Sequence, residues 1–282
     1  MKKIQYTLFR VKIVKSVQKD LFNKLEEKTP KDILEFLLNE SLSYEFRIDH
    51  QWRKGRVHKI NKSSGFFNFG KISLSDLELF DNEENEFQTV SYNSGIHTRV
   101  VYDLDFGLFA VGVNYNLGNP STIARKLEKV FNEAKIIKSN NITVYVSKIA
   151  DPKNFIRKLF SAHSIKQLRA NFTGPNPLDA DELFQKPLSR FLQAANGESG
   201  TTIIKGANLD AEVVESVSRS TAATGNDASA RIQKSKSSRP ETIDFKGDPL
   251  RLTYNGGSVS PDIVARDMIK AYQEIRHGEK DA

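Results

Sequence analysis

The chain has 282 residues, of which 38% are hydrophobic and 27% charged, and this composition is typical of a globular protein with a packed core. Its formal net charge is +7, which favours polyanionic partners through local basic patches. The absence of cysteine excludes disulfides, cysteine-ligated zinc, iron–sulfur clusters and thiol nucleophiles. A chain without cysteine suits a reducing compartment, so we expect a cytoplasmic protein.

The first segment reads as a strand. Residues 4–15 alternate apolar and polar side chains instead of forming the continuous apolar run of a signal peptide. No later window approaches the roughly 18 apolar residues that a membrane span needs, so no membrane insertion is expected. Two short helices are predicted at 17–27 and 30–40, the second with Thr29 as its cap and Pro30 at its first position.

The next hundred residues favour strands. Residues 42–72 predict short, irregular strands. Residues 76–87 are acidic and are interpreted as a solvated loop or a short helix inserted between strands. Residues 96–104 and 107–116 predict a hairpin, because turn-forming residues separate two alternating segments.

A regular alternation of elements follows. Asn119 and Pro120 begin an amphipathic helix that extends to Ile137. A strand at 141–149, a short helix from Asp151–Pro152 and a strand at 164–172 come next. This order predicts an α+β fold with mixed or antiparallel sheets and helices packed on one face.

The stretch TGPNPL at 173–178 is the most loop-like part of the chain, and we take it as the junction between two lobes. The predicted domains are an N-terminal α+β domain at 1–173 and a C-terminal α+β domain at 174–282. The second domain is predicted to contain helices at 179–195 and 209–224, strands at 201–205, 229–236, 241–246 and 249–254, and a closing amphipathic helix from Ser260.

No set of residues qualifies as a catalytic site. The five histidines lack metal-ligand spacing and no Gly-rich phosphate loop is present, so neither a metal nor another cofactor is expected. His97 and Arg99 share one face of a predicted strand and could serve phosphoryl chemistry, although a polar solvent face explains them more simply. The acidic runs at 103–105 and 179–182 read as a turn and a helix start.

Two basic segments are the strongest functional signal. Residues 152–170 and 228–240 contain no carboxylate. Cations without internal counter-charges suit phosphate contacts, although a solvated loop is an alternative explanation for the second segment. The predicted nucleic-acid-binding residues are Lys153, Arg157, Lys158, Lys166, Arg169, Arg231, Lys234, Lys236 and Arg239. Neither segment has a recognition helix or an aromatic stacking pattern, so base-specific readout is not implied.

The order of elements adds a family resemblance. From Phe106 to Asn176, a glycine-containing aromatic strand leads into a proline-started helix, a strand, a basic segment and a polar bend. A helix, a basic strand and the closing helix SVSPDIVARDMIKAYQEI follow. This layout resembles the RexA-like exclusion proteins of temperate lambdoid phages and the KwaB-like proteins of anti-phage defence. The resemblance implies a cytoplasmic, self-associating protein that binds DNA without marked sequence preference.

Two hypotheses follow. The first is a non-enzymatic sensor or effector of phage exclusion that binds DNA, or RNA, as a homodimer, with a partner effector protein as a further candidate. The second is a metal-dependent nuclease or toxin whose active site is assembled from dispersed residues such as His97, Arg99 and nearby acids. In the first hypothesis, the region after the 173–178 bend contributes most of the dimer contact. The closing helix must bury its apolar face either on its own sheet, which is the commoner outcome, or on a partner chain.

Overall fold

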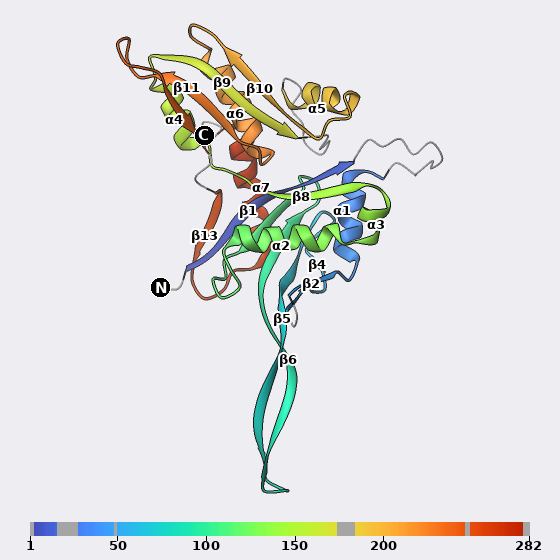
Figure 1. Cartoon of the computed structure of the whole chain (residues 1–282). Helices are drawn as coiled ribbons and strands as arrows, with labels where there is room; N and C mark the ends of the chain where they lie inside the picture. The colour runs from blue at the N-terminus through green and yellow to red at the C-terminus, as the bar shows by residue number, and fades with distance from the viewer. Residues whose placement is uncertain (1–2, 16–27, 48–49, 174–183, 246–248, 279–282) are drawn as a thin grey trace.

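A computed structural model describes residues 3–15, 28–47, 50–173, 184–245 and 249–278. The fold is α+β, as predicted, with a nine-stranded and a four-stranded antiparallel sheet. Figure 1 shows the two sheets stacked along the molecule, with a long hairpin projecting from the end opposite the small sheet. No helix in the described ranges is both long enough and apolar enough to cross a membrane.

The large sheet is built mainly from the first half of the chain. Its strand order is β13-β1-β7-β6-β5-β3-β2, with β8 also paired to β1 and β4 to β5. Its strands are β1 (Lys3–Lys15), β2 (Ser43–Arg47), β3 (His50–Lys54), β4 (His58–Lys59), β5 (Ser64–Asp81), β6 (Glu86–Asp103), β7 (Leu108–Gly112), β8 (Ile142–Lys148) and β13 (Arg251–Asn255).

Helices cover both faces of this sheet. On one face, Phe9, Phe109 and their neighbours pack against α1 (Pro30–Asn39), α2 (Pro120–Asn132) and α3 (Lys135–Ser139). On the other face, Leu8, Ala110 and their neighbours pack against α7 (Pro261–His277). Successive strand residues point to opposite faces, so one strand can supply both cores.

The small sheet has the order β10-β9-β11-β12. Its strands are β9 (Ser164–Thr173), β10 (Ser199–Lys205), β11 (Ala228–Gln233) and β12 (Glu241–Asp244). The helices that accompany it in the chain are α4 (Lys153–Phe160), α5 (Gln185–Ala194) and α6 (Ala211–Ala223). Buried residues of α4 and α6 share one apolar core with the inner face of this sheet and with α7.

The segment that carries the small sheet lies in sequence between β8 and β13 of the large sheet. Two neighbouring stretches of the chain join it to the large sheet, and we call them the neck. At β1, the Leu8 carbonyl accepts from Ile149 N (3.1 Å) while Leu8 N donates to the Leu250 carbonyl (3.0 Å). Ala150 and Pro249 form an antiparallel bridge beside them. The chain therefore leaves and re-enters the large sheet at one point. β9 precedes the predicted boundary at 173/174 but belongs to the small sheet, and β13 follows the boundary but belongs to the large sheet. That the two sides of the boundary fold independently stays a prediction.

Most predicted elements are confirmed, and three details are wrong. The acidic segment 76–87 is a loop only at residues 82–85, which form the turn of the β5–β6 hairpin, and it contains no helix. Residues 76–81 and 86–87 belong to β5 and β6, because acidic and apolar residues alternate from Asp76 to Leu79 with the period of a strand. The helix expected to reach Ile137 ends at Asn132 and restarts as α3. The helical spacing of apolar residues after Pro152 and from 209 to 224 predicts that Phe160 and Val213 point inward, but both are exposed. The helix predicted at 17–27 and most of the 173–178 bend lie outside the described residues.

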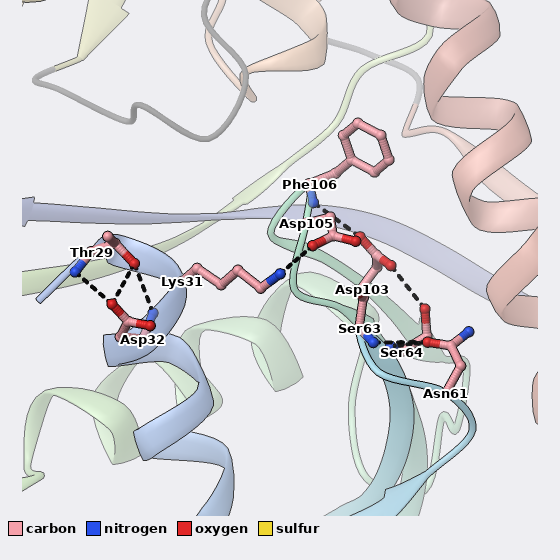
Figure 2. A network of polar contacts seen from close by, with 9 residues as sticks. All are labelled: Thr29, Lys31, Asp32, Asn61, Ser63, Ser64, Asp103, Asp105 and Phe106. Atoms are coloured by element: carbon pink, nitrogen blue, oxygen red, sulfur yellow. Dashed lines mark hydrogen bonds and ion pairs between the residues drawn. The ribbon is translucent and has the colours of Figure 1, made fainter.

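The predicted turn at 103–105 forms a polar corner that ties α1 to the large sheet (Figure 2). Buried Asp103 accepts from Ser64 Oγ (2.8 Å) and from Phe106 N (2.9 Å), and its burial raises its pKa. Asp105 pairs with Lys31 of α1 at 2.5 Å. The cap of α1 is confirmed, since Thr29 Oγ1 accepts from the N–H of the residue three positions on.

Two buried cations of β1 are on the face covered by α7 and the inserted lobe. Arg10 Nη1 donates to the Tyr272 hydroxyl of α7 (2.8 Å). Lys12 Nζ donates to Asn226 Oδ1 (2.8 Å) and to the Gly225 carbonyl (3.3 Å) at the end of α6. Burial, reinforced by the nearby Arg10 charge, lowers the pKa of Lys12 to about 7. These bonds fasten β1 to both C-terminal elements that cover it.

This burial predicts a pH-dependent stability. Unfolded Lys12 keeps its proton to a higher pH than folded Lys12, so the unfolded state binds more protons between pH 7 and the ordinary lysine pKa of 10.5. The free energy of unfolding should therefore rise through this window, by up to about 1.4 kcal/mol per pH unit, and should be flat with respect to Lys12 at lower pH. Lys12→Met should lose this rise.

Urea unfolding of the wild type and of Lys12→Met over this pH range gives the measurement. Lys236→Met is the matched control, because Lys236 is exposed and should leave the pH dependence unchanged. Equal pH slopes for the wild type and Lys12→Met would contradict a charged-state penalty at Lys12.

Candidate nucleic-acid interface

The outer face of the small sheet brings together cations from three strands. In the register, Lys205 of β10 lies opposite Gln167 of β9, and Gln167 lies opposite Arg231 of β11. Arg169, two residues further along β9, is on the same face and has both cations as diagonal neighbours. The two basic segments of the sequence thus meet on adjacent strands at Arg169 and Arg231.

The alternation of side chains explains why this face is polar. Leu168, Ala170 and Ala230 point inward and are almost fully buried. Their chain neighbours Arg169 and Arg231 point outward and are exposed. Among the described residues, neither arginine has an ion-pair partner, and the same holds for Lys205. The face therefore offers full positive charges to solvent.

The turn between β11 and β12 extends the basic surface beyond the sheet. Gln233 Nε2 donates to the Lys236 carbonyl (3.1 Å) and to the Ser238 carbonyl (2.7 Å). Ser238 closes the turn by donating its N–H to the Ser235 carbonyl (3.0 Å). Lys236 and Arg239 are exposed on or beside this turn. The segment expected to be a strand up to residue 236 is therefore a hydrogen-bonded turn from 234 onward.

Two of the predicted contact residues are engaged within the chain. Lys234 forms an ion pair with Glu241 at 2.8 Å, and this carboxylate lies just beyond the acid-free segment. The pair is exposed, so it contributes little to stability, but it reduces the charge that Lys234 offers. Lys166 lies at a bulge of β9, and its ammonium donates to the Ala207 carbonyl (2.6 Å). Lys234 is therefore paired with a carboxylate, whereas the Lys166 ammonium keeps its charge but is held at the Ala207 carbonyl.

The remaining three predicted residues form a separate surface. Lys153, Arg157 and Lys158 lie on α4, whose residues Phe155 and Leu159 are buried under the inner face of the small sheet. The α4 cations therefore lie on the helix layer, and the sheet separates them from Arg169 and Arg231. The single patch expected at 152–170 is thus split between two faces of the lobe.

Sequence reasoning missed Lys205 and the amides between the cations. Lys205 ends the predicted strand at 201–205, but only strand pairing places it beside β9. Gln167 and Asn171 share the outer face with the arginines and offer amide donors for phosphate oxygens. Alternation within the predicted strand at 164–172 was the available signal, because it separates 167, 169 and 171 from the apolar positions.

The residues suggested for phosphoryl chemistry are placed differently. His97 is exposed on β6 of the large sheet, whereas Arg99 is half-buried and lies over the Phe66 ring, 5.2 Å from its centroid. Arg99 Nη1 also donates to the Val259 carbonyl (3.3 Å). Within the described part of the chain, no three histidine, aspartate or glutamate side chains gather as a metal site would require. No observation therefore favours the nuclease alternative.

Known families add one finding. The model of a family described as a domain of unknown function, DUF4747, matches residues 3–256. The chain belongs to the DUF4747 family. The matched residues extend from β1 through β13, so both sheets and the neck between them are part of the family domain. No curated protein matches the chain.

The closing helix does not offer the dimer face that the sequence analysis expected. Val264, Met268, Tyr272 and Ile275 of α7 are almost fully buried in the core of their own chain. Their apolar face is therefore already covered, and the physical argument for dimerisation through this helix fails.

The turn that carries Lys236 gives a testable prediction. Gln233→Ala removes both side-chain hydrogen bonds to the turn, so the free energy of unfolding should fall by about 1–2 kcal/mol. Amide hydrogen exchange at 235–239 should become faster. Gln167→Ala is the control, since the Gln167 amide makes no hydrogen bond to a described residue. Unchanged exchange in Gln233→Ala would show that the turn does not depend on this amide.

Proposed function

We propose that this protein binds nucleic acid through the outer face of the small sheet, without reading base sequence. The observation that carries the proposal is the alignment of Lys205, Arg169 and Arg231 on three adjacent strands of one exposed face. Lys236 and Arg239 extend the same charge beyond the sheet. A surface that neutralises several phosphates gains affinity by releasing condensed counterions.

The composition of the face supports phosphate contact over base contact. Beside the cations, the outward positions hold Gln167, Asn171, Thr201, Ser229 and Thr242, all of which can donate to phosphate oxygens. The same face also holds Ile203 opposite Arg169 and one carboxylate, Asp244, opposite Ser229. No aromatic side chain is at an outward position of these four strands as described, so the stacking platform of sequence-reading RNA-binding sheets is missing. The proposed ligand is therefore a DNA or RNA backbone.

The biological setting is a further part of the proposal. The order of elements shared with RexA-like and KwaB-like proteins supports a role in phage exclusion or anti-phage defence, with the protein acting as a non-catalytic sensor or effector. This role rests on that resemblance alone, whereas nucleic-acid binding rests on the charged face.

The salt dependence of binding tests the proposal. Fluorescence anisotropy with a labelled DNA duplex should show an affinity that falls steeply with salt, with a log–log slope of about −0.9 per neutralised phosphate. Replacing Arg169, Lys205 and Arg231 together by Ala should weaken binding and reduce the slope by up to about 2.7, because three contacts are lost. An unrelated duplex sequence should give the same result. An RNA duplex and single-stranded DNA establish which backbone is preferred.

The matched control removes the same charge elsewhere. Lys153, Arg157 and Lys158 of α4 replaced by Ala lower the net charge by the same amount but leave the sheet face intact. Equal losses of affinity in the two triple variants would show that net charge, not this face, governs binding. Melting curves of both variants establish that they remain folded.

A further inference from the structure

The outer half of the β5–β6 hairpin stands away from the rest of the molecule. The two strands pair in register from Ser64↔Asp103 to Asp81↔Glu86. Other strands of the large sheet flank only the inner rows, and β3 reaches no further than Ile72. We call residues 72–95 the arm, and Figure 1 shows it projecting as a two-stranded ribbon. Such a ribbon is marginally stable in water unless something packs on it.

The arm exposes an unusual amount of apolar surface. Its exposed large hydrophobic residues are Leu74, Leu77, Leu79, Phe80, Phe87, Val90 and Tyr92. Phe80 and Phe87 lie opposite each other near the end, with ring centroids 5.0 Å apart, and Phe87 is 69% exposed. The register puts Leu77, Leu79, Val90 and Tyr92 on one face of the ribbon and Leu74, Phe80 and Phe87 on the other. Scattered exposed apolar residues need no explanation, but apolar groups on both faces of a projecting ribbon mark an interaction surface. The arm therefore requires a partner surface.

The arm is also strongly acidic. No lysine or arginine occurs from residue 72 to residue 98. The acids are Asp76, Glu78, Asp81, Glu83, Glu84 and Glu86, and none of them forms an ion pair with a described residue. We call residues 76–87 the tip. The partner surface must accept both aromatic rings and negative charge.

A pocket at the root of the same hairpin has the complementary character. Its volume is about 360 Å³, and no carboxylate is among its lining residues. Arg53 of β3, Gly70 of β5 and His97 of β6 lie in one row across three strands, so the two basic side chains flank a position that has no side chain. The space at Gly70 is filled by the chain itself, since a Cβ there would lie 2.2 Å from the Ile96 carbonyl oxygen, whereas Gly95 is an open position. Lys71 and Asn68 also line the pocket. We call this the base pocket.

The base pocket is open to an external ligand. Arg53 and His97 are exposed, and their side chains make no hydrogen bond or ion pair to a described residue. A Cβ added to Gly95 would meet only the Lys71 carbonyl, at 3.6 Å, so packing within the chain does not require glycine there. A cationic, glycine-floored pocket of this size can accept an aromatic ring together with carboxylates.

The tip cannot reach the base pocket of its own chain. The strands stay paired row by row from Gly70↔His97 to Asp81↔Glu86. At about 3.4 Å per residue this holds the Phe80–Phe87 pair, ten rows beyond Gly70, roughly 34 Å from the pocket row. Only the tip of another molecule can enter it.

We propose that the protein self-associates through its arms, the tip of each copy docking in the base pocket of the other. Both halves of the contact are on one chain, so a two-fold arrangement makes them twice and closes the dimer. Phe80 and Phe87 supply the apolar anchor, while the tip carboxylates face Arg53 and His97. Side-by-side pairing of two tips in the same direction would instead bring like charges together.

This inference goes beyond nucleic-acid binding, because it uses the end of the molecule opposite the small sheet (Figure 1). It also places self-association on the arm and not on the C-terminal region. Sedimentation equilibrium of the full chain at low salt should give about twice the 31.8 kDa chain mass, and the dimer should weaken as salt rises.

Charge reversal provides the decisive experiment. The tip variant carries Glu78→Lys, Glu83→Lys and Glu84→Lys, and it spares Asp81, whose carboxylate accepts from the Glu83 and Glu84 N–H groups in the turn. The base variant carries Arg53→Glu and His97→Glu. Each alone should be monomeric, but an equimolar mixture of the two should form a heterodimer, because both tip–pocket contacts are then again between opposite charges.

An apolar variant and a matched control complete the test. Phe87→Ala should raise the dimer dissociation constant on the order of tenfold or more, as expected for an aromatic anchor. Lys205→Glu with Lys236→Glu makes a comparable charge change on the small-sheet side and should leave the dimer intact while weakening nucleic-acid binding. A monomeric wild type, a dimer that survives both reversals, or a mixture that stays monomeric would overturn the proposal. None of these outcomes bears on the nucleic-acid interface, which the salt titration tests by itself.

Discussion

The structure depends on the pairing of β1 along both of its edges. One edge bonds to β7, and the other bonds first to β13 and then to β8, with the changeover at Leu8. β1, near the start of the chain, therefore pairs with β7 and β8 from the middle of the chain and with β13 from near its end. The inserted lobe begins after β8 and ends before β13, so its two ends lie where these two strands meet beside Leu8. Removing β1 would leave its three neighbours, β7, β8 and β13, unpaired along one edge, and the unsatisfied N–H and C=O groups would be costly in a buried sheet.

The side chains of β1 distribute the cores in the same way. Phe9, Val11 and Ile13 pack under α1, α2 and α3, whereas Tyr6 and Leu8 belong to the core shared with α7 and the small sheet. Arg10 and Lys12 are on this second side, where apolar residues would be expected. Their bonds to α7 and to the end of α6 replace apolar packing with directional contacts, so the lobe is oriented as well as covered. The two stretches of chain in the neck would by themselves fix only the position of the lobe, not its orientation.

The charges are arranged along the molecule in a way that net charge does not reveal. The small sheet presents arginine and lysine at one end, the arm presents carboxylates at the other, and the base pocket between them is cationic. An acidic arm kept far from the basic face does not compete with a polyanion for it. The acidic tip and the cationic base pocket lie at opposite ends of one hairpin. The tip of one molecule is therefore complementary to the base pocket of a second copy. Folding thus converts a modest overall charge into three distinct surfaces.

Most of the fold was predictable, because local physical rules decide where strands and helices form. The alternation of apolar and polar residues predicted strands β1 and β9. A capping residue followed by proline predicted the first residues of α1, α2 and α7. The acidic segment at 76–87 was misinterpreted because its charge density was weighed above its period-two pattern. The candidate site was predicted only in part. Arg169 and Arg231 were identified as basic residues, but their meeting on one face depends on the β9–β11 register.

The sequence by itself determined the chemical classes: no thiol chemistry, an α+β chain, two acid-free basic segments and one acidic segment. The tertiary structure decided which of those charges remain available. Lys234 is paired with the Glu241 carboxylate, Lys166 is held at the Ala207 carbonyl, the α4 cations lie on another layer, and Lys205 joins the basic face of the small sheet from β10. The physical reason is that charge is a property of residues, whereas exposure, pairing and proximity arise from strand register and layer packing between segments far apart in the chain.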